Sequence, residues 1–304
     1  MMKISILAYL PGVEELVAKI AWASISGLPP PEISVSEDDV TRLFRLARTM
    51  KLSSVLDFPF YIFSISGVSR VFTHQWVRYR IAAHIQQSMR WVKIDTGFDP
   101  ENPWFIVPPS VVKQGVEAVV RYVKGVVDAG RRYLELVDSG VPTEDARFVL
   151  PHAVKTHIST VMNAEELLHV IEQRTCFDAQ WEIRTVAYVL LAALYALSPR
   201  IFRDAGPYCV WEGICRGRGR GKCLNEAKSL TQKALEAGKR ARKMLEKASY
   251  KRNVVLDLTD LFGFRANPEI KATVGEMLGL DEPVNLDYPA ILEIKSLSEV
   301  LNID

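Results

Sequence analysis

The sequence predicts an α+β fold, in which strands and helices share one chain without a regular β-α-β alternation. Short segments with strand character stand between longer segments whose apolar residues recur every three or four positions. No glycine-rich phosphate fingerprint follows a predicted strand, which argues against a doubly wound nucleotide fold. The chain of 304 residues is 48% apolar and 24% charged, so it can bury a substantial core.

The first predicted elements are a strand near 3–9 and a helix near 13–25, followed by a loop with three consecutive prolines that prevent regular structure. A second helix follows at about 37–50. The alternation in 58–66 predicts a strand, and the helical spacing of apolar residues in 67–87 predicts a helix.

Further along the chain, Asn163 and Glu166 have the spacing of a capping box and predict the start of a helix. A loop rich in glycine and arginine, 215–223, is expected before the last long helix, and the tail gives mixed signals. We find no internal repeat. The other elements are predicted as a long amphipathic helix at 110–139, a strand at 156–162, a helix at 163–174, a helix at 179–197 and a charged helix near 225–249.

Charge and hydropathy exclude some classes of protein. A net charge of +2 gives no overall electrostatic footprint for nucleic acid or membrane, so an anion site must be built locally. The basic loop "RGRGRGK" could bind nucleic acid, but a solvated loop is the favoured interpretation because no wider basic surface accompanies it. The first residues lack a signal-peptide pattern, and the longest apolar run, 186–197, is shorter than the roughly 20 residues that cross a bilayer. We therefore expect a cytoplasmic protein.

Arginine recognises phosphate because its guanidinium offers several donors in a fixed fork and stays charged when partly buried. Each arginine taken singly is better explained as a surface residue in a salt bridge. Together they predict an anion site. The nearby glutamines and Ser88 could form hydrogen bonds to a nucleobase, or they could simply be the solvated end of a helix. The arginines that lie beside apolar residues are Arg78, Arg80, Arg90, Arg147, Arg174 and Arg184.

The segment "GVSRVFTHQWVRYRIAAHIQQSMRW" resembles the signature of the flavin-dependent thymidylate synthases, the ThyX family. That signature is Arg-His-Arg, seven residues, Ser, and then Arg with an aromatic residue, and here it reads Arg78, Tyr79, Arg80, seven residues, Ser88, Arg90 and Trp91. Two further blocks, "EDARFVLP" and "NAEELLHVIEQRTCFDAQWEIR", resemble family blocks in the same order. The resemblance covers residues 1–224 as a nucleotide-binding catalytic domain. Residues 225–304 are left as a partly helical C-terminal extension of unknown role.

The resemblance implies a mixed sheet with helices and a homotetramer with active sites between subunits. It implies reductive methylation of deoxyuridylate (dUMP) to thymidylate (dTMP), with methylenetetrahydrofolate as carbon donor and NADPH as reductant through FAD. The implied dUMP contacts are Gln75, Gln87, Ser88, Arg90, Arg147 and Arg174. The implied flavin contacts are Arg78, Tyr79, Arg80 and Asn163.

Among these residues, Arg174 is the expected catalytic group, because a cation at the pyrimidine carbonyls stabilises the negative charge that develops on the ring. Ser88 has no histidine at a motif position to activate it, so phosphate binding is expected for it rather than nucleophilic attack.

The sequence departs from the family pattern mainly on the flavin side. Tyr79 stands where the family has histidine, and Glu165 stands where it commonly has arginine. These departures predict altered cofactor handling, because tyrosine cannot carry histidine's charge. An alternative function is therefore a deoxyuridylate-binding paralogue with a lost or changed flavin site, acting as a sensor or partner subunit. The other departures are Leu52, Asp57, Phe58, Ala83 and Ile85.

All four cysteines fall between 176 and 223, and three of them cluster in "YCVWEGICRGRGRGKC". Four thiolates can close a tetrahedral zinc site, although the spacing is looser than in standard zinc motifs. Reduced thiols and disulfides are the other interpretations. The candidate ligands are Cys176, Cys209, Cys215 and Cys223.

Overall fold

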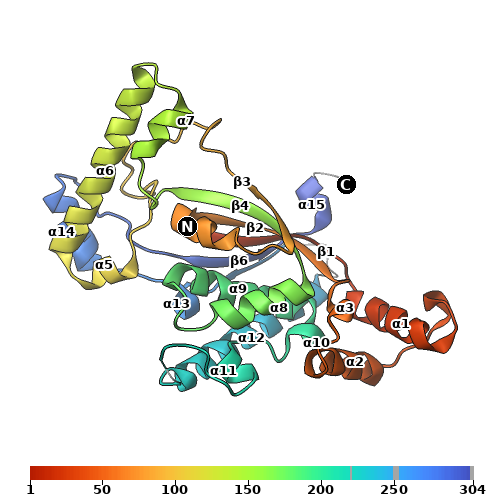
Figure 1. The fold of residues 1–304 in the computed structure, drawn as a ribbon. Coiled ribbons are helices and arrows are strands. Elements are labelled where there is room, and N and C mark those ends of the chain that lie inside the picture. The colour runs from red at the N-terminus through yellow and green to blue at the C-terminus, as the bar shows by residue number, and fades with distance from the viewer. Residues whose placement is uncertain (220, 249–252, 302–304) are drawn as a thin grey trace.

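A single mixed sheet of six strands organises the chain, in the order β3-β4-β2-β1-β6-β5 (Figure 1). The computed structural model describes residues 1–219, 221–248 and 253–301. All neighbouring strands are antiparallel except β1 and β6, which are parallel. The predicted α+β fold is confirmed. The strands are β1 Met2–Tyr9, β2 Phe60–Ser69, β3 Ala82–Gln86, β4 Lys155–Asn163, β5 Val254–Asp257 and β6 Ala290–Ile294.

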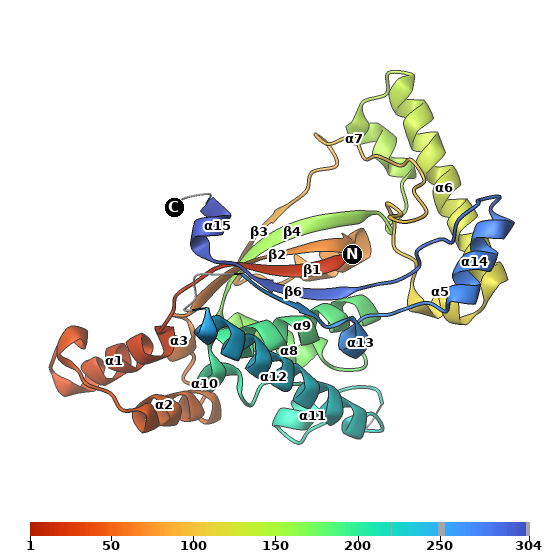
Figure 2. The same cartoon turned by 180° about the vertical axis from the view of Figure 1, so that it is seen from behind.

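Helices α8, α9 and α12 pack on one face of this sheet, and α6 and α14 lie together at one end of it (Figures 1 and 2). The longer helices are α1 Val13–Ser26, α2 Glu37–Thr49, α6 Val116–Asp138, α8 Ala164–Arg174, α9 Trp181–Leu197, α12 Leu224–Lys247 and α14 Pro268–Met277. The shorter ones are η1 Pro30–Glu32, α3 Ser53–Leu56, α4 Arg70–Trp76, α5 Pro109–Lys113, α7 Thr143–Ala146, η2 Arg147–Val149, α10 Pro199–Phe202, α11 Tyr208–Trp211, α13 Thr259–Phe262 and α15 Leu297–Leu301.

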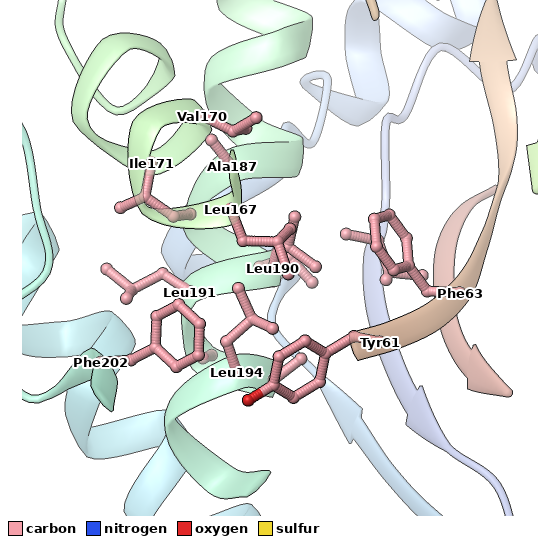
Figure 3. Close-up of a cluster of buried hydrophobic side chains, with 14 of the residues drawn as sticks. Tyr61, Phe63, Leu167, Val170, Ile171, Ala187, Leu190, Leu191, Leu194 and Phe202 are labelled. Atoms are coloured by element: carbon pink, nitrogen blue, oxygen red, sulfur yellow. The ribbon is translucent and has the colours of Figure 1, made fainter. Parts of the chain in front are cut away.

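The main core forms between the sheet and helix α9, which is apolar almost all round and buried along most of its length. Figure 3 shows Tyr61 and Phe63 of β2 pointing toward Leu190 and Leu194 of α9. A helix that is apolar on every side must be enclosed by other elements. In the described part of the chain, no helix is both long and apolar enough to cross a membrane.

The helix predicted over 67–87 is present only as α4, and the prediction is wrong at both ends. Strand β2 continues to Ser69, α4 spans only seven residues, and 82–86 form strand β3. Trp76 Nε1 and His84 Nδ1 both contact the Thr160 hydroxyl at 3.0 Å, which fixes the turn between α4 and β3 against β4. Pairing with β4 therefore overrides the local helical spacing.

The predicted helix over 110–139 is divided into α5 and α6. Gly115 has φ 98°, a conformation that glycine adopts without steric penalty, and it separates the two segments. The other predicted strands and helices are present within a few residues of the expected positions, as far as the described residues extend; Ser249, the last residue of the predicted charged helix, lies outside them.

Residues beyond 224 add to the same sheet. Strand β6 pairs with β1 in parallel, β5 pairs with β6 at the edge, and α12 packs along α9. The predicted domain boundary at 224 remains a prediction, but the segment that follows it contributes two of the six strands.

One buried carboxylate joins three parts of the chain. Glu182, in the first turn of α9, is 1% exposed. Its carboxylate accepts hydrogen bonds from the Ser69 backbone N–H at 2.8 Å, from the Ser69 hydroxyl at 2.5 Å and from the Tyr288 hydroxyl at 3.0 Å. Burial raises the pKa of Glu182, and these three donors oppose the rise.

We expect Tyr288→Phe to lower the free energy of unfolding by about 1–3 kcal/mol, because it leaves a buried carboxylate with one donor fewer. Denaturant unfolding of the variant and the wild type measures the difference. Tyr195→Phe is the matched control, since the Tyr195 hydroxyl makes no hydrogen bond within the described residues. Equal loss in both variants would show that the bond to Glu182 carries no special stabilisation.

Candidate anion-binding site

Helix α4 places the side chains of the candidate site, and Ser69 sets where that helix begins. The Ser69 hydroxyl accepts the Phe72 N–H at 3.1 Å as an N-cap while it donates to Glu182. Arg70, Thr73 and His74 of α4 then line a hollow of about 500 Å³. The hollow is completed by Gln86 of β3 and by residues around 147–152 that include Arg147 and His152.

Arg70 and Arg147 face this hollow without a carboxylate partner in the described part of the chain. Arg70 Nη1 donates to the Gln87 carbonyl at 3.4 Å, and Arg147 Nε donates to the Glu144 carbonyl at 2.9 Å. Burial lowers the pKa of Arg70, and the positive charge of Arg147 lowers it further. Two cations that repel each other across a polar hollow make it a candidate site for an anion, because a phosphate would supply the missing countercharge.

Polar side chains around the two arginines contact one another. Gln86 Nε2 donates to the Thr73 hydroxyl at 2.8 Å. The rings of His74 and His152 meet edge to face with centroids 6.4 Å apart. Both histidines are exposed and available to a ligand.

Three of the predicted dUMP contacts lie close to this hollow but are bonded within the chain. Gln75 Nε2 donates to the Val71 carbonyl at 3.4 Å. Gln87 Oε1 accepts the Thr156 hydroxyl at 3.3 Å, and Ser88 Oγ accepts the Arg90 backbone N–H at 3.1 Å. The bonds of Gln87 and Ser88 fix the turn after β3, whereas that of Gln75 lies within α4; each side chain would have to leave its bond to reach a ligand.

Arg90 differs from Arg70 and Arg147 because it has a partner. Its Nε pairs with the Glu144 carboxylate, and its guanidinium lies 5.1 Å from the ring centroid of the exposed Trp91. Binding of an anion by Arg90 must therefore compete with Glu144.

Arg174 lies at the end of α8 and lines a separate hollow of about 290 Å³. Its Nε donates to the Tyr79 hydroxyl at 2.6 Å, and that hydroxyl donates to Gln173 Oε1 at 3.3 Å. Tyr79 is 7% exposed, with its ring in edge contact with Trp76 and His169. Within one chain, Tyr79 thus orients Arg174, and Arg174 and Arg147 are not brought into one hollow.

The remaining predicted flavin contacts divide into two kinds. Arg78 and Arg80 are exposed and have no ion pair within the described residues. Asn163 is buried, where its Oδ1 caps α8 through the Glu166 N–H at 2.9 Å and its Nδ2 donates to Asp57 at 2.7 Å. The predicted start of this helix is confirmed, although the described residues show no return bond from the Glu166 carboxylate.

Arg184, the last of the predicted arginines, has a structural role. Its Nη1 donates to the carbonyls of Phe177 and Ala179 at 3.0 and 3.1 Å, which closes the loop before α9.

The sequence analysis missed Arg70, His74 and His152. Arg70 and His74 are four residues apart at the start of a helix, a spacing that places them on one face. The predicted helix over 67–87 contains both residues, so this signal was present in the sequence but was not used. Nothing in the sequence placed His152 near them, since that contact depends on the return of the chain at β4.

The fold is that of an α+β protein, and Arg70 and Arg147 form a candidate anion site in it. The family model described as "Thymidylate synthase complementing protein" matches residues 5–200. The chain is 41% identical to a flavin-dependent thymidylate synthase of Sulfolobus acidocaldarius over 69% of this chain and 78% of that protein. It is 40% identical to one from Geobacter sulfurreducens, over 69% of this chain and 89% of the relative. The chain therefore belongs to the ThyX family, as the sequence motifs predicted.

A solved structure supports the fold. The UMP/dUMP methylase PolB from Streptomyces cacaoi superimposes with a TM-score of 0.59 at 19% identity, over 67% of this chain and 94% of that one. At this identity the likeness concerns the fold alone.

We expect Arg70→Met to leave the free energy of unfolding unchanged or higher, because it removes the repulsion from Arg147. The same variant should bind a phosphate monoester roughly ten- to hundredfold more weakly, since a charge-assisted contact is lost. Thermal unfolding and titration calorimetry measure the two effects. Arg45→Met, at an exposed position on α2, is the control; unchanged affinity in Arg70→Met would remove Arg70 from the site.

Proposed function

We propose that this chain is a flavin-dependent thymidylate synthase, which methylates dUMP reductively to dTMP with methylenetetrahydrofolate and NADPH through FAD. The observation that carries the proposal is the two arginines Arg70 and Arg147, which have no carboxylate partner within the described residues and line a hollow built from the family's own motif blocks. The relatives at about 40% identity carry the same activity in their names.

The residues suggest a division of work. Arg147 and Arg70 would hold the phosphate of dUMP, with Gln75, Gln87, Ser88 and Arg90 around the phosphate and sugar. Arg174, held by the Tyr79 hydroxyl, would stabilise negative charge at the pyrimidine carbonyls.

Arg78 and Arg80, which are exposed and have no ion pair in the part of the chain that the structure describes, fit the diphosphate of FAD, which supplies the hydride chemistry when bound. Tyr79 has little exposed surface, so its contribution to a flavin would be indirect, through the residues that it supports.

A second copy of the chain would complete the site. Arg147 and Arg174 line different hollows in one chain, and apolar side chains are exposed on one face of β2 and around β3. Such a surface favours association, and we propose a homotetramer with sites between subunits, located in the cytoplasm. The exposed apolar residues of this surface are Phe60, Ile62, Ile81, Ile85 and Trp91.

The alternative function, deoxyuridylate binding without flavin, is not favoured, because the relatives at about 40% identity are named as flavin-dependent enzymes. Flavin content after gel filtration, followed by dUMP-dependent NADPH oxidation and dTMP formation, tests the proposal. Stoichiometric FAD with dTMP formation supports the enzyme. A colourless protein that binds dUMP and forms no dTMP supports the alternative.

Arg147→Ala and Arg90→Ala test the substrate contacts. We expect each to weaken dUMP binding roughly ten- to hundredfold, the range for a charge-assisted hydrogen bond. Titration calorimetry with dUMP gives the affinities. If both variants bind dUMP like the wild type, the phosphate does not bind where we place it.

Tyr79→Phe tests how Arg174 is oriented. The variant keeps the buried ring but removes the hydroxyl that accepts Arg174 Nε, so we expect kcat for dTMP formation to fall about tenfold or more with FAD content retained. Steady-state kinetics and flavin absorbance measure both quantities, with Tyr195→Phe as control. A loss of FAD with an unchanged kcat for the loaded enzyme would instead make Tyr79 a flavin contact.

A further inference from the structure

The segment from Tyr208 to Cys223 has almost no core of its own. Of its described residues, none is buried, and its regular structure is limited to the four-residue helix α11. Small folds with too little buried apolar surface are often stabilised by a cross-link or a metal, and the same device could stabilise this segment. The question is what holds it here.

All four cysteines meet at this segment. They line the same hollow of about 290 Å³, although they come from four separate places: Cys176 after α8, Cys209 in α11, Cys215 in the loop and Cys223 at the start of α12. None of them forms a disulfide within the described residues.

The loop backbone lies close to two of these sulfur atoms. The Gly221 N–H donates to Cys215 Sγ at 3.1 Å. A side chain at Gly217 would place its Cβ 3.4 Å from Cys176 Sγ and 2.9 Å from Asp178 Oδ2, so only glycine fits there without displacement. Gly217 and Gly221 therefore bring the backbone close to two of the thiols, and an N–H directed at sulfur suits a thiolate.

We propose that Cys176, Cys209, Cys215 and Cys223 bind one zinc ion as four thiolates, and that this ion holds residues 208–223 against the end of α8. Four sulfur ligands select a soft, tetrahedral ion, and zinc is the ion that closed sites of this composition usually hold. As the side chains lie, no group of three or more His, Cys, Asp or Glu residues in the described chain is set to hold a metal ion. Binding therefore requires the thiols to turn into the hollow and to release their protons.

The position of the proposed zinc site also connects it to α8 and α2. Arg174 lines the same hollow and precedes Cys176 by two residues. On the other side of the segment, the Trp211 ring lies 3.8 Å beneath the Arg48 guanidinium of α2, and Arg48 pairs with Glu172 of α8 at 2.8 Å. The ion would thus fix both the C-terminal turn of α8 and the contact of the segment with α2.

The test begins with the full chain, purified without chelator or histidine tag. Elemental analysis should find one zinc per chain, and a mercurial reagent that titrates the native thiols should release the zinc as the thiols react. Replacement of zinc by cobalt should give the visible absorption of a tetrahedral cobalt thiolate. These three measurements need no variant and no catalytic activity, so they are independent of the proposed enzymatic function.

Variants then assign the ligands. Cys215→Ser and Cys223→Ser should each lose the zinc and should unfold at lower temperature than the wild type. Ile214→Ser, at an exposed neighbouring position, should keep the zinc. The proposal is overturned by wild-type protein that has less than about a tenth of an equivalent of zinc after zinc is supplied to it, by disulfides among the four cysteines, or by variants that retain stoichiometric zinc.

Discussion

The buried Glu182 carboxylate is the interaction on which the arrangement of the site depends. A carboxylate that is 1% exposed must have its oxygens satisfied, because an unpaired buried charge is strongly destabilising. Its donors come from Ser69, at the junction of β2 and α4, and from Tyr288, near the C-terminal end of the described chain. Helix α9, the start of α4 and the C-terminal segment are therefore held at one point.

The Ser69 hydroxyl therefore takes part in two hydrogen bonds. It donates to Glu182 and accepts from Phe72, so the first turn of α4 has a fixed position and direction relative to α9. Arg70 follows immediately and faces Arg147 across the hollow. The repulsion between the two guanidinium groups is tolerated because the elements that carry them are anchored elsewhere, as is common where binding sites keep unfavourable charge.

Glu165 and Tyr79, the two main departures from the family pattern, both have contacts within the chain that involve arginine. Glu165, at a position where the family commonly has arginine, lines a hollow of about 270 Å³ with Arg48 of α2 and Lys51 just after it, so positive charge is present beside it. Burial raises the pKa of Glu165, the nearby Asp57 adds to the rise, and Arg48 opposes it. Tyr79 stands where the family has histidine, and its hydroxyl accepts a hydrogen bond from Nε of Arg174, the predicted pyrimidine contact.

The sequence by itself determined the class of fold, the family blocks and the ends of several helices, because these depend on local spacing and on residue chemistry. Asn163 capped α8 as predicted, since a cap involves residues only three apart. The tertiary structure alone decided that 82–86 form a strand, because pairing with β4 involves residues more than 70 positions away. It also decided that Tyr288 reaches Glu182, that Tyr79 holds Arg174 and that Arg70 faces Arg147. These contacts join segments far apart in the chain, and local periodicity carries no information about such pairs.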